Sequence, residues 1–600
     1  MTSTSGPDHD RQGHRTMSRT ATRDLKLEST RPPRPAVAEA KKESFREFVE
    51  QIVVAFILAM LIRGFDAEAF VIPTGSMAPT LMGRHKEVVC PQCGHQYAIN
   101  ASDETEKFIV DRKLGEMGIC GNCRFRTPVD DTPSFKGDRI LVMKFPYELP
   151  FLPASSGPKR WDVVVFHYPE NPETNYIKRL VGLPGEELRI NHGDIQARPR
   201  GDNAAFAIER KPLYHQKAMQ MLVYDDAHRA KLLADKPEWR RWQGGSAWKE
   251  EAAGTYATAS APGSAWSDLR YRHLVPDPEQ WAAAEKSDPM PRGPRPTLIT
   301  DFYSYNTNIS TSYYDRWLQE HEGWLQLNWV GDLTVSCRVD VTSASPGAKA
   351  RFELIEAGIA NRCEVDLATG VASIFHGDQK LGEAPTSLKG QGARDVTFAN
   401  VDDRLTLWVD GSTPFGEGLP FEDPPTTPYA PTARDLDPVG VAFQGASGRV
   451  SDLVLKRDIY YTQDPRDPDY KISGVYESID REDQREYGRV LKMFDFLADP
   501  TKFPTLETHA PQKAYVIRPD HFMMMGDNSP RSSDSRAWSS NDSNWGVEDR
   551  SSWEVPRTML VGKAFFVYWP HGKPFGPDVR LSRDFRLPFR PYFERMKWIR

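Results

Sequence analysis

Residues 161–166 read WDVVVF, and residues 175–185 read NYIKRLVGLPG. Both segments are short and apolar, and the second ends in a Pro-Gly turn, so the pattern predicts two adjacent β-strands. Side chains alternate along a strand, which places Lys178 on one face together with Tyr176 and Leu180. A lysine in this position either protects an edge strand from aggregation or is a desolvated amine with a lowered pKa. A neutral lysine of the second kind can act as general base for a serine.

A candidate nucleophile lies earlier in the chain, in residues 70–81, which read FVIPTGSMAPTL. Ser76 follows a glycine and has prolines on both sides, so we expect it on a turn that exposes its hydroxyl and N–H. Residues 520–536 read DHFMMMGDNSPRSSDSR, which predicts an apolar strand, a turn and a polar loop. That loop offers hydroxyls to orient a lysine amine and, in Asp534 and Arg536, an ion pair as a brace.

In this order behind an apolar N-terminal segment, these stretches resemble the bacterial type I signal peptidases, the membrane-bound Ser/Lys leader peptidases of family S26. The boxes that carry the resemblance are residues 73–80, 136–142 (KGDRILV), 162–185 and 526–536. They lie within residues 45–85, 135–197 and 513–570, under a third of the chain. The resemblance implies a mainly β catalytic domain that hydrolyses the bond behind the signal peptide of an exported preprotein, through an acyl-enzyme. Small residues at positions −1 and −3 of the substrate are implied as well.

Carried over residue by residue, the resemblance makes Ser76 the nucleophile and Lys178 the general base. Ser532 matches the hydroxyl that orients the lysine. Thr74 matches the position whose hydroxyl joins the Ser76 N–H in the oxyanion hole, where many members of the family have serine. The brace of Asp534 and Arg536 matches residues that are structural near the site. The chemistry so implied needs no cofactor.

Residues 43–66 are predicted to form a transmembrane helix, because they contain the unbroken apolar run 52–62 with charges near its ends. A cleaved signal peptide and a buried helix are the alternatives. Basic residues precede the run and acidic residues follow it, so residues 1–42, whose composition predicts disorder, are expected in the cytoplasm. The catalytic domain is then extracytoplasmic, on a single-pass protein of the plasma (inner) membrane that has the lipid bilayer as a partner.

Two C-x-x-C motifs, CPQC at 90–93 and CGNC at 120–123, lie in the segment 86–129. This spacing predicts a zinc ribbon in which four thiolates surround one structural zinc ion. The ligands would be Cys90, Cys93, Cys120 and Cys123. Disulfides are the alternative, because the expected topology places the segment outside the cytoplasm.

Residues 198–512 form a large insert, in which short alternating segments with turn signals predict a β-sandwich or jelly roll, weakly similar to concanavalin A-like and laminin-G-like domains. Cys337 and Cys363 fall on inward faces, either as thiols or as one disulfide. Tryptophans of the insert either pack internally or stack on sugars, so its partner would be a glycan or a protein. They are Trp239, Trp242, Trp248, Trp317, Trp324 and Trp329. We expect the insert to be separable from the protease, whose motifs lie outside it.

The catalytic domain is thus expected to comprise residues 67–85, 130–197 and 513–600. Its basic and aromatic end, 580–600, either lies on anionic lipid or packs across the sheet. With 39% hydrophobic residues and a net charge of −6, the 600-residue chain is neither wholly disordered nor a general nucleic-acid binder. One alternative is another Ser/Lys protease of this fold, such as the self-cleaving repressors, against which the membrane helix argues. The other is a catalytically inactive envelope protein that binds a glycan or a protein partner through the insert.

Overall fold

The structure is a computed structural model. It describes residues 45–61, 67–102, 117–129, 132–144, 157–307, 328–424, 428–463, 494–503, 514–538, 553–580 and 586–599. The chain divides into two compact units, residues 1–60 and 61–600, and each is treated by itself.

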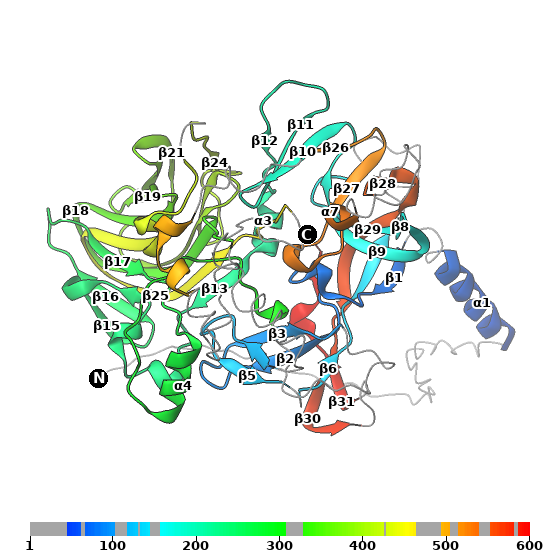
Figure 1. Ribbon diagram of the computed structural model, residues 1–600, viewed down its shortest axis with the longest axis horizontal. Helices are drawn as coiled ribbons and strands as arrows, with labels where there is room; N and C mark the ends of the chain where they lie inside the picture. Colours follow the sequence, from blue (N-terminus) through cyan, green and yellow to red (C-terminus); the bar gives the residue numbers. More distant parts are fainter. Residues whose placement is uncertain are drawn as a thin grey trace, which may run out of the picture. The chain divides into compact units, whose positions relative to one another are not determined.

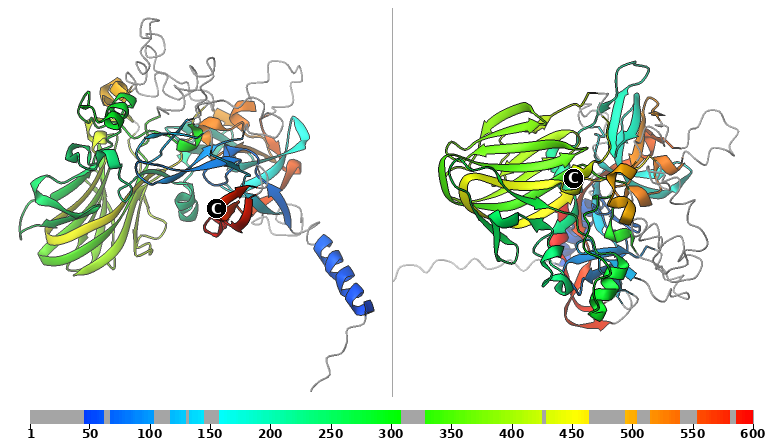
Figure 2. Two further views of the ribbon diagram at one scale, coloured as in Figure 1. Left: turned by 90° about the horizontal axis from the view of Figure 1, so that it is seen from below. Right: turned by 60° about the vertical axis from the view of Figure 1, so that its left-hand side comes forward.

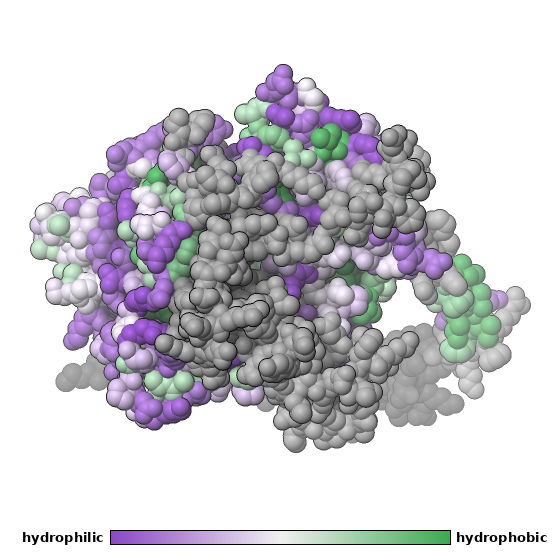
Figure 3. All heavy atoms as spheres, in the orientation of Figure 1, coloured by the Kyte–Doolittle hydropathy of each residue, from purple (hydrophilic) through white to green (hydrophobic). Residues whose placement is uncertain are grey.

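The described part of the first unit is residues 45–60 of helix α1 (Phe45–Leu61), which lies within the predicted helical segment 43–66. Large apolar side chains of α1, among them Phe48, Ile52, Val54 and Phe56, are exposed. Figure 3 shows most of this helix in green, the colour of hydrophobic residues. Among the residues described, no helix combines the length and the apolar character that a membrane crossing requires. The predicted tail 1–42 and residues 62–66 lie outside the described residues.

The second unit contains an eight-stranded sheet that carries the three motif segments (Figure 1). Its order is β1-β7-β29-β8-β9-β27-β28, and β32 pairs with β29. The strands are β1 (Ala67–Val71), β7 (Arg139–Met143), β8 (Val163–Tyr168), β9 (Asn171–Gly182), β27 (His521–Met525), β28 (Val555–Pro556), β29 (Leu560–Trp569) and β32 (Lys597–Trp598). The two strands predicted around Lys178 are therefore present as β8 and β9, and they pair antiparallel with Lys178 opposite Val164. Because β32 joins this sheet, part of the segment 580–600 packs onto the catalytic domain.

Smaller sheets flank the eight-stranded one. One has the order β12-β11-β10-β26, a second β3-β2-β6, and two pairs are β4-β5 and β30-β31. Their strands are β2 (His85–Val89), β3 (Gln96–Asn100), β4 (Met117–Ile119), β5 (Arg126–Pro128), β6 (Ser134–Phe135), β10 (Glu186–Asn191), β11 (Asp194–Pro199), β12 (Ala207–Ile208), β26 (Ala514–Val516), β30 (Gly572–Arg580) and β31 (Arg586–Pro591). The protein is mainly β, as predicted. Short helices are α3 (Leu213–Met219), α4 (Pro278–Lys286) and α7 (Ser535–Trp538).

The insert contains a sandwich built around two long bent strands, β18 (Leu333–Glu356) and β25 (Val439–Arg457), which pair with each other (Figure 2). The first part of β18 also pairs with β22 and its last part with β19, so the strand passes from one layer to the other. Alternate residues of β18 from Leu333 to Val341 are buried, which confirms the inward face that the sequence predicts. The remaining strands are β13 (Met221–Asp225), β14 (Trp242–Gln243), β15 (Trp248–Ala252), β16 (Thr255–Ala259), β17 (Ser267–Tyr271), β19 (Ile359–Asp366), β20 (Val371–His376), β21 (Gln379–Pro385), β22 (Gly392–Asn400), β23 (Arg404–Val409) and β24 (Leu419–Pro420).

The core of the insert accounts for its cysteines and most of its tryptophans. Cys337 and Cys363 are buried free thiols, which resolves the choice between thiols and a disulfide. The side chains of Trp239, Trp242, Trp248 and Trp329 are also buried, so these four are not exposed for stacking on a sugar. Trp317 and Trp324 lie outside the described residues.

The apolar core around strands β8, β9 and β27 includes side chains of the insert, which argues against the expectation that the protease core closes without it. Met219 and Met221 at one end of the insert, and Ile459 and Tyr461 beyond β25, belong to the same apolar cluster as the strands β8, β9 and β27. The backbone of Thr462 continues this contact, because its carbonyl accepts a hydrogen bond from Arg536 Nη1 at 2.7 Å. Sequence patterning does not reveal such contacts, because they join segments that are remote in the chain.

Two truncations test this dependence. Replacing residues 198–512 by a Gly/Ser linker removes all four apolar side chains, each contributing about 1.5–3 kcal/mol when buried. That loss is comparable with the whole stability of a domain, about 5–15 kcal/mol, so we expect no cooperative unfolding by urea. Deleting only residues 226–453 and joining Asp225 to Val454, which face each other across β13 and β25, by Asn-Gly should retain a cooperative transition. Equal cooperativity in both variants would contradict the shared core.

Candidate active site

Ser76 lies in a single 3-10 turn, Gly75–Met77, that follows β1, and its side chain is buried. This agrees with the turn predicted from its glycine and prolines. Gly75 is required because a Cβ there would lie 2.3 Å from Cε1 of Tyr305. Gly526 is required on the other side, because its Cβ would lie 2.4 Å from the carbonyl oxygen of Ser76. The serine backbone is thus enclosed by two close approaches that only glycine permits.

Lys178 extends from β9 toward this turn, and its Nζ lies 2.7 Å from Ser76 Oγ in a hydrogen bond. The lysine side chain is 4% exposed. Burial lowers the pKa of Lys178 to about 8; Arg536 lowers it as well, whereas Asp534 and Asp527 act to raise it. The two residues that the sequence singles out as nucleophile and base are therefore in contact, and the amine loses its proton far more readily than an exposed lysine does.

Next to Lys178 on the strand, Arg179 forms a fully buried ion pair with Asp527. Its Nε and Nη2 donate to the two carboxylate oxygens at 2.6 Å each, and Nη1 donates to the carbonyl of Trp161 at 2.7 Å. Thr80 Oγ1 donates to the same carboxylate at 2.5 Å. The pair thus joins the lysine strand, the serine loop and the turn after β27.

Asp534 and Arg536 form a second buried ion pair, with Nε–Oδ1 and Nη2–Oδ2 distances of 2.9 and 2.7 Å. Asp534 also accepts a hydrogen bond from the N–H of Gly526 at 3.0 Å. Ser532 is buried beside Gly526, and its hydroxyl has no hydrogen-bond partner among the described residues. Thr74 precedes the serine turn with an exposed side chain that does not cap it.

The insert contributes to the serine loop through the turn Ser304–Asn306. The side-chain amides of Asn306 and Asn528 form two reciprocal hydrogen bonds of 2.8 Å. Asn528 in turn donates from Nδ2 to the Gly75 carbonyl and from its backbone N–H to the Ser76 carbonyl, both at 3.1 Å. A residue of the insert therefore fixes the side chain that holds the backbone of the candidate nucleophile.

Sequence reasoning included Arg179, Asp527 and Asn528 in the family boxes without giving them a role, and it did not single out Tyr305 or Asn306. The Gly-Asp-Asn triplet at 526–528 was a usable signal, because a turn of this composition after a buried strand places a carboxylate and an amide at the strand end. Tyr305 and Asn306 carried no signal, because nothing in their surroundings points to the segment they contact.

The four predicted metal ligands Cys90, Cys93, Cys120 and Cys123 form one buried cluster between the turns of β2-β3 and β4-β5. The Sγ atoms of Cys90 and Cys123 are 3.5 Å apart, and those of Cys93 and Cys120 are 3.6 Å apart. A disulfide needs about 2.05 Å. Four sulfurs at about 2.3 Å from a tetrahedral zinc ion are about 3.8 Å from one another, so the cluster fits the ion and not the alternative of disulfides.

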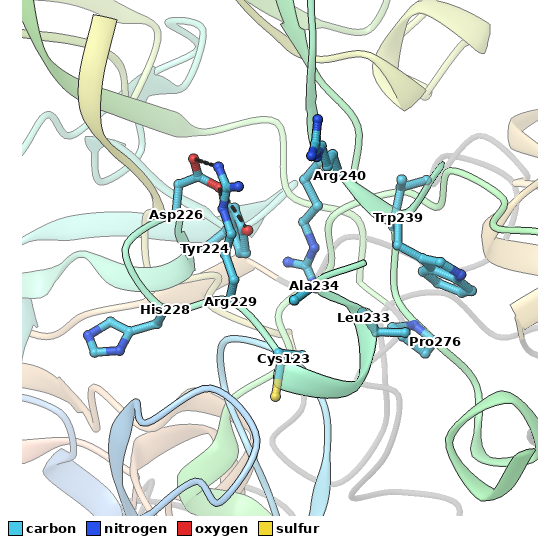
Figure 4. Close-up of a pocket in the computed structure, with 13 residues that line it drawn as sticks. Cys123, Tyr224, Asp226, His228, Arg229, Leu233, Ala234, Trp239, Arg240 and Pro276 are labelled. Atoms are coloured by element: carbon cyan, nitrogen blue, oxygen red, sulfur yellow. Dashed lines mark hydrogen bonds and ion pairs between the residues drawn. The ribbon is translucent and has the colours of Figure 1, made fainter. Parts of the chain in front are cut away.

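A small pocket lies beside Cys123, lined by residues of the insert that include Tyr224, His228 and Trp239 (Figure 4). Two of its charged residues form an ion pair, in which Arg229 Nη2 lies 2.7 Å from Asp226. Neither Ser76 nor Lys178 lines it. The pocket is separate from the candidate catalytic pair.

Residues 130–228 and 471–569 match the family model "Signal peptidase, peptidase S26". The chain resembles the S26 signal peptidases. A Signal peptidase I of Pseudomonas aeruginosa is 32% identical over 159 residues, which are 26% of this chain and 39% of that relative. One of Leptolyngbya laminosa is 29% identical over 180 residues, 29% of this chain and 60% of that relative. The chain thus spans less than two thirds of these Signal peptidase I relatives.

A comparison of structures gives distant similarities. The carbohydrate-binding module CBM66 from Bacillus subtilis aligns with 21% of this chain and 75% of its own, with 9% identity and a TM-score of 0.17.

The Arg179–Asp527 pair is testable with a single and a double variant. Arg179→Met leaves the Asp527 carboxylate buried without its main partner, so we expect a loss of about 3–5 kcal/mol in the free energy of unfolding. Adding Asp527→Leu should recover part of that loss, because no charge then stays buried. Urea unfolding of both variants measures this. Arg338→Met, at the exposed pair with Asp395, is the control and should cost below about 1 kcal/mol. Equal losses for Arg179→Met and the control would contradict the role of the buried pair.

Proposed function

We propose that the chain is a type I signal peptidase that cleaves N-terminal signal peptides from exported preproteins with a Ser76/Lys178 dyad. The observation that carries the proposal is the 2.7 Å contact between Ser76 Oγ and the buried Nζ of Lys178. The S26 match of residues 130–228 and 471–569, which include Lys178, supports the reaction class. Small residues at substrate positions −1 and −3 are part of the proposal.

With a pKa of about 8, roughly one Lys178 in ten is neutral at pH 7. The neutral amine accepts the Ser76 proton while Oγ attacks the scissile carbonyl, and the resulting ammonium then protonates the leaving amine. Water, deprotonated by the same lysine, hydrolyses the acyl-enzyme. We assign the oxyanion contacts to the Ser76 N–H and the Thr74 hydroxyl, and the orientation of Nζ to Ser532. Asp534 and Arg536 hold the turn around Gly526 and do not react.

The proposal places the enzyme at the plasma (inner) membrane, with residues 43–66 as the anchor. The exposed apolar side chains of α1 favour burial in lipid, because their exposure to water is unfavourable. Signal peptides also enter the bilayer, so a tethered protease meets its substrate at the membrane surface and loses less orientational entropy on binding. The N-terminal tail is cytoplasmic and the catalytic domain extracytoplasmic in this arrangement.

The four-cysteine cluster is proposed to hold one structural zinc ion. Zinc would join the two turns at 90–93 and 120–123, and it takes no part in the peptidase chemistry. Thr307 Oγ1 accepts a hydrogen bond from the N–H of Ile119 at 3.0 Å, which joins the cluster to the same insert segment that holds Asn528.

Cleavage should depend on pH through the lysine. Because the base must be deprotonated, kcat/KM for a preprotein is expected to rise about tenfold per pH unit below pH 8 and to level off above it. A rate profile between pH 6 and pH 9.5 measures this. A rate that is constant across that range would contradict a lysine base with this pKa.

Variants of the dyad provide the matching test. Ser76→Ala and Lys178→Ala should lower cleavage by several orders of magnitude, and Lys178→Arg should fail too because a guanidinium stays protonated. Lys380→Ala changes an exposed lysine of the insert and should cleave normally. Near-normal turnover by either alanine variant would contradict the proposed dyad. It would favour the alternative of a catalytically inactive envelope protein that binds a glycan or a protein partner.

Elemental analysis of protein purified without reductant tests the zinc ion. The four-cysteine site is expected to hold one zinc per chain. The variant Cys90→Ser/Cys120→Ser should contain no zinc and should unfold at a lower Tm, because bound metal stabilises the folded state. Cys337→Ser, at a buried thiol outside the cluster, should retain it. Four oxidised cysteines without metal would contradict this assignment.

A further inference from the structure

A second group of metal-binding side chains lies outside both sites described above. It consists of His85 and Glu87 on β2 and His571 after β29. One ligand atom from each side chain lies within 4.8 Å of the others. His85 and Glu87 are two residues apart on a strand and so share a face, and the fold brings His571 to them from the far end of the chain.

The imidazoles of this group are buried without the partners that buried polar atoms normally have. His85 is fully buried, His571 is 4% exposed, and neither His85 Nε2 nor either ring nitrogen of His571 makes a hydrogen bond within the described residues. His571 Nε2 lies 3.3 Å from Glu87 Oε1. A buried polar atom left without a partner costs about 1–3 kcal/mol, so an occupant that contacts one nitrogen of each imidazole would be stabilising.

Hydrogen bonds from neighbouring groups already orient these side chains, as they do around the ligands of metal sites. His85 Nδ1 lies 2.7 Å from the carbonyl of Gly83, a contact that places the proton on Nδ1 and leaves the Nε2 lone pair toward the group. Glu87 Oε2 accepts a hydrogen bond from Gln96 Nε2 at 3.0 Å, and Oε1 is the oxygen that faces His571. The nearby cation Arg595 is itself paired with Asp138, at 3.0 Å.

We propose that His85, Glu87 and His571 bind one divalent transition-metal ion of the zinc class. Two imidazoles and a carboxylate suit zinc, and at 2.0–2.2 Å from each ligand the three donor atoms would be roughly 3.4 Å apart, within reach of small side-chain rotations. Three protein ligands leave one position for water.

Such an ion ties the start of β2 to the segment after β29. The turn at Gly83 lies against the backbone of Thr74, since a Cβ at Gly83 would be 2.2 Å from the Thr74 carbonyl carbon. The ion would therefore stabilise the position of the turn at Gly83, which contacts the loop that carries Ser76. It takes no part in the peptidase reaction itself.

The test is a Co²⁺ titration of the full-length chain in detergent, after removal of metal under reducing conditions. Two equivalents are expected: one with the strong thiolate-to-cobalt absorption of the four-cysteine site, and one without it. His571→Ala should abolish only the second, and Cys90→Ser/Cys120→Ser only the first. His273→Ala, at an equally buried histidine outside the group, should retain both.

Glu87→Gln keeps the shape of the side chain and serves if His571→Ala does not fold. It should weaken the second equivalent by about tenfold or more, because even loss of an outer contact to a metal ligand costs 10–100-fold. A wild-type protein that binds a single, thiolate-bound equivalent overturns the proposal. So does a second equivalent that neither Glu87→Gln nor His571→Ala weakens.

Discussion

The buried carboxylate of Asp527 is the contact on which the arrangement of the candidate site depends. It accepts hydrogen bonds from Arg179 on β9 and from Thr80 behind the serine turn, and Tyr461 of the insert approaches it at 3.4 Å. Because a charge without solvent contact is tolerated only when it is fully paired, all of these segments must be in register for the carboxylate to be buried. Satisfying one charge thus positions the serine loop, the strand that carries the base and the turn after β27.

Burial is the main reason why Lys178 loses its proton readily, and the ion pairs limit what opposes it. An opposite charge beside a buried lysine would keep it protonated, and two carboxylates, Asp527 and Asp534, are near enough to act in that direction. Each is held by its own arginine, Arg179 and Arg536 respectively. Burial therefore outweighs the attraction, and the lysine is left with a hydroxyl, not a carboxylate, as its hydrogen-bond partner. Two ion pairs that look structural thereby leave burial as the main influence on the pKa of the base.

Sequence patterns predicted those structural features that depend on a periodic or local arrangement of residues. The alternation of residues 333–341 gave the inward face of β18, the strands around Lys178 followed from apolar runs and a Pro-Gly turn, and the C-x-x-C spacing gave the four-cysteine cluster. Contacts between remote segments left no such pattern. His571 meets His85 only because β29 ends beside β2, and Asn306 meets Asn528 only because the insert folds back on the catalytic domain. The carried-over roles of Thr74 and Ser532 stay predictions, because they concern groups that act on a substrate or on a particular orientation of the amine.

The insert is best understood as part of the packing of the catalytic loop. Tyr305 occupies the space that any side chain at residue 75 would need, so the glycine before the nucleophile is matched to a residue more than two hundred positions away. Asn306 then reaches the Ser76 backbone through Asn528, and Tyr461 lies in the apolar cluster with β27. Packed interiors tolerate little loss of volume, so a change in the insert at these points is transmitted to the serine turn by contact alone. A domain boundary drawn where the catalytic motifs stop therefore cuts through the core that positions them.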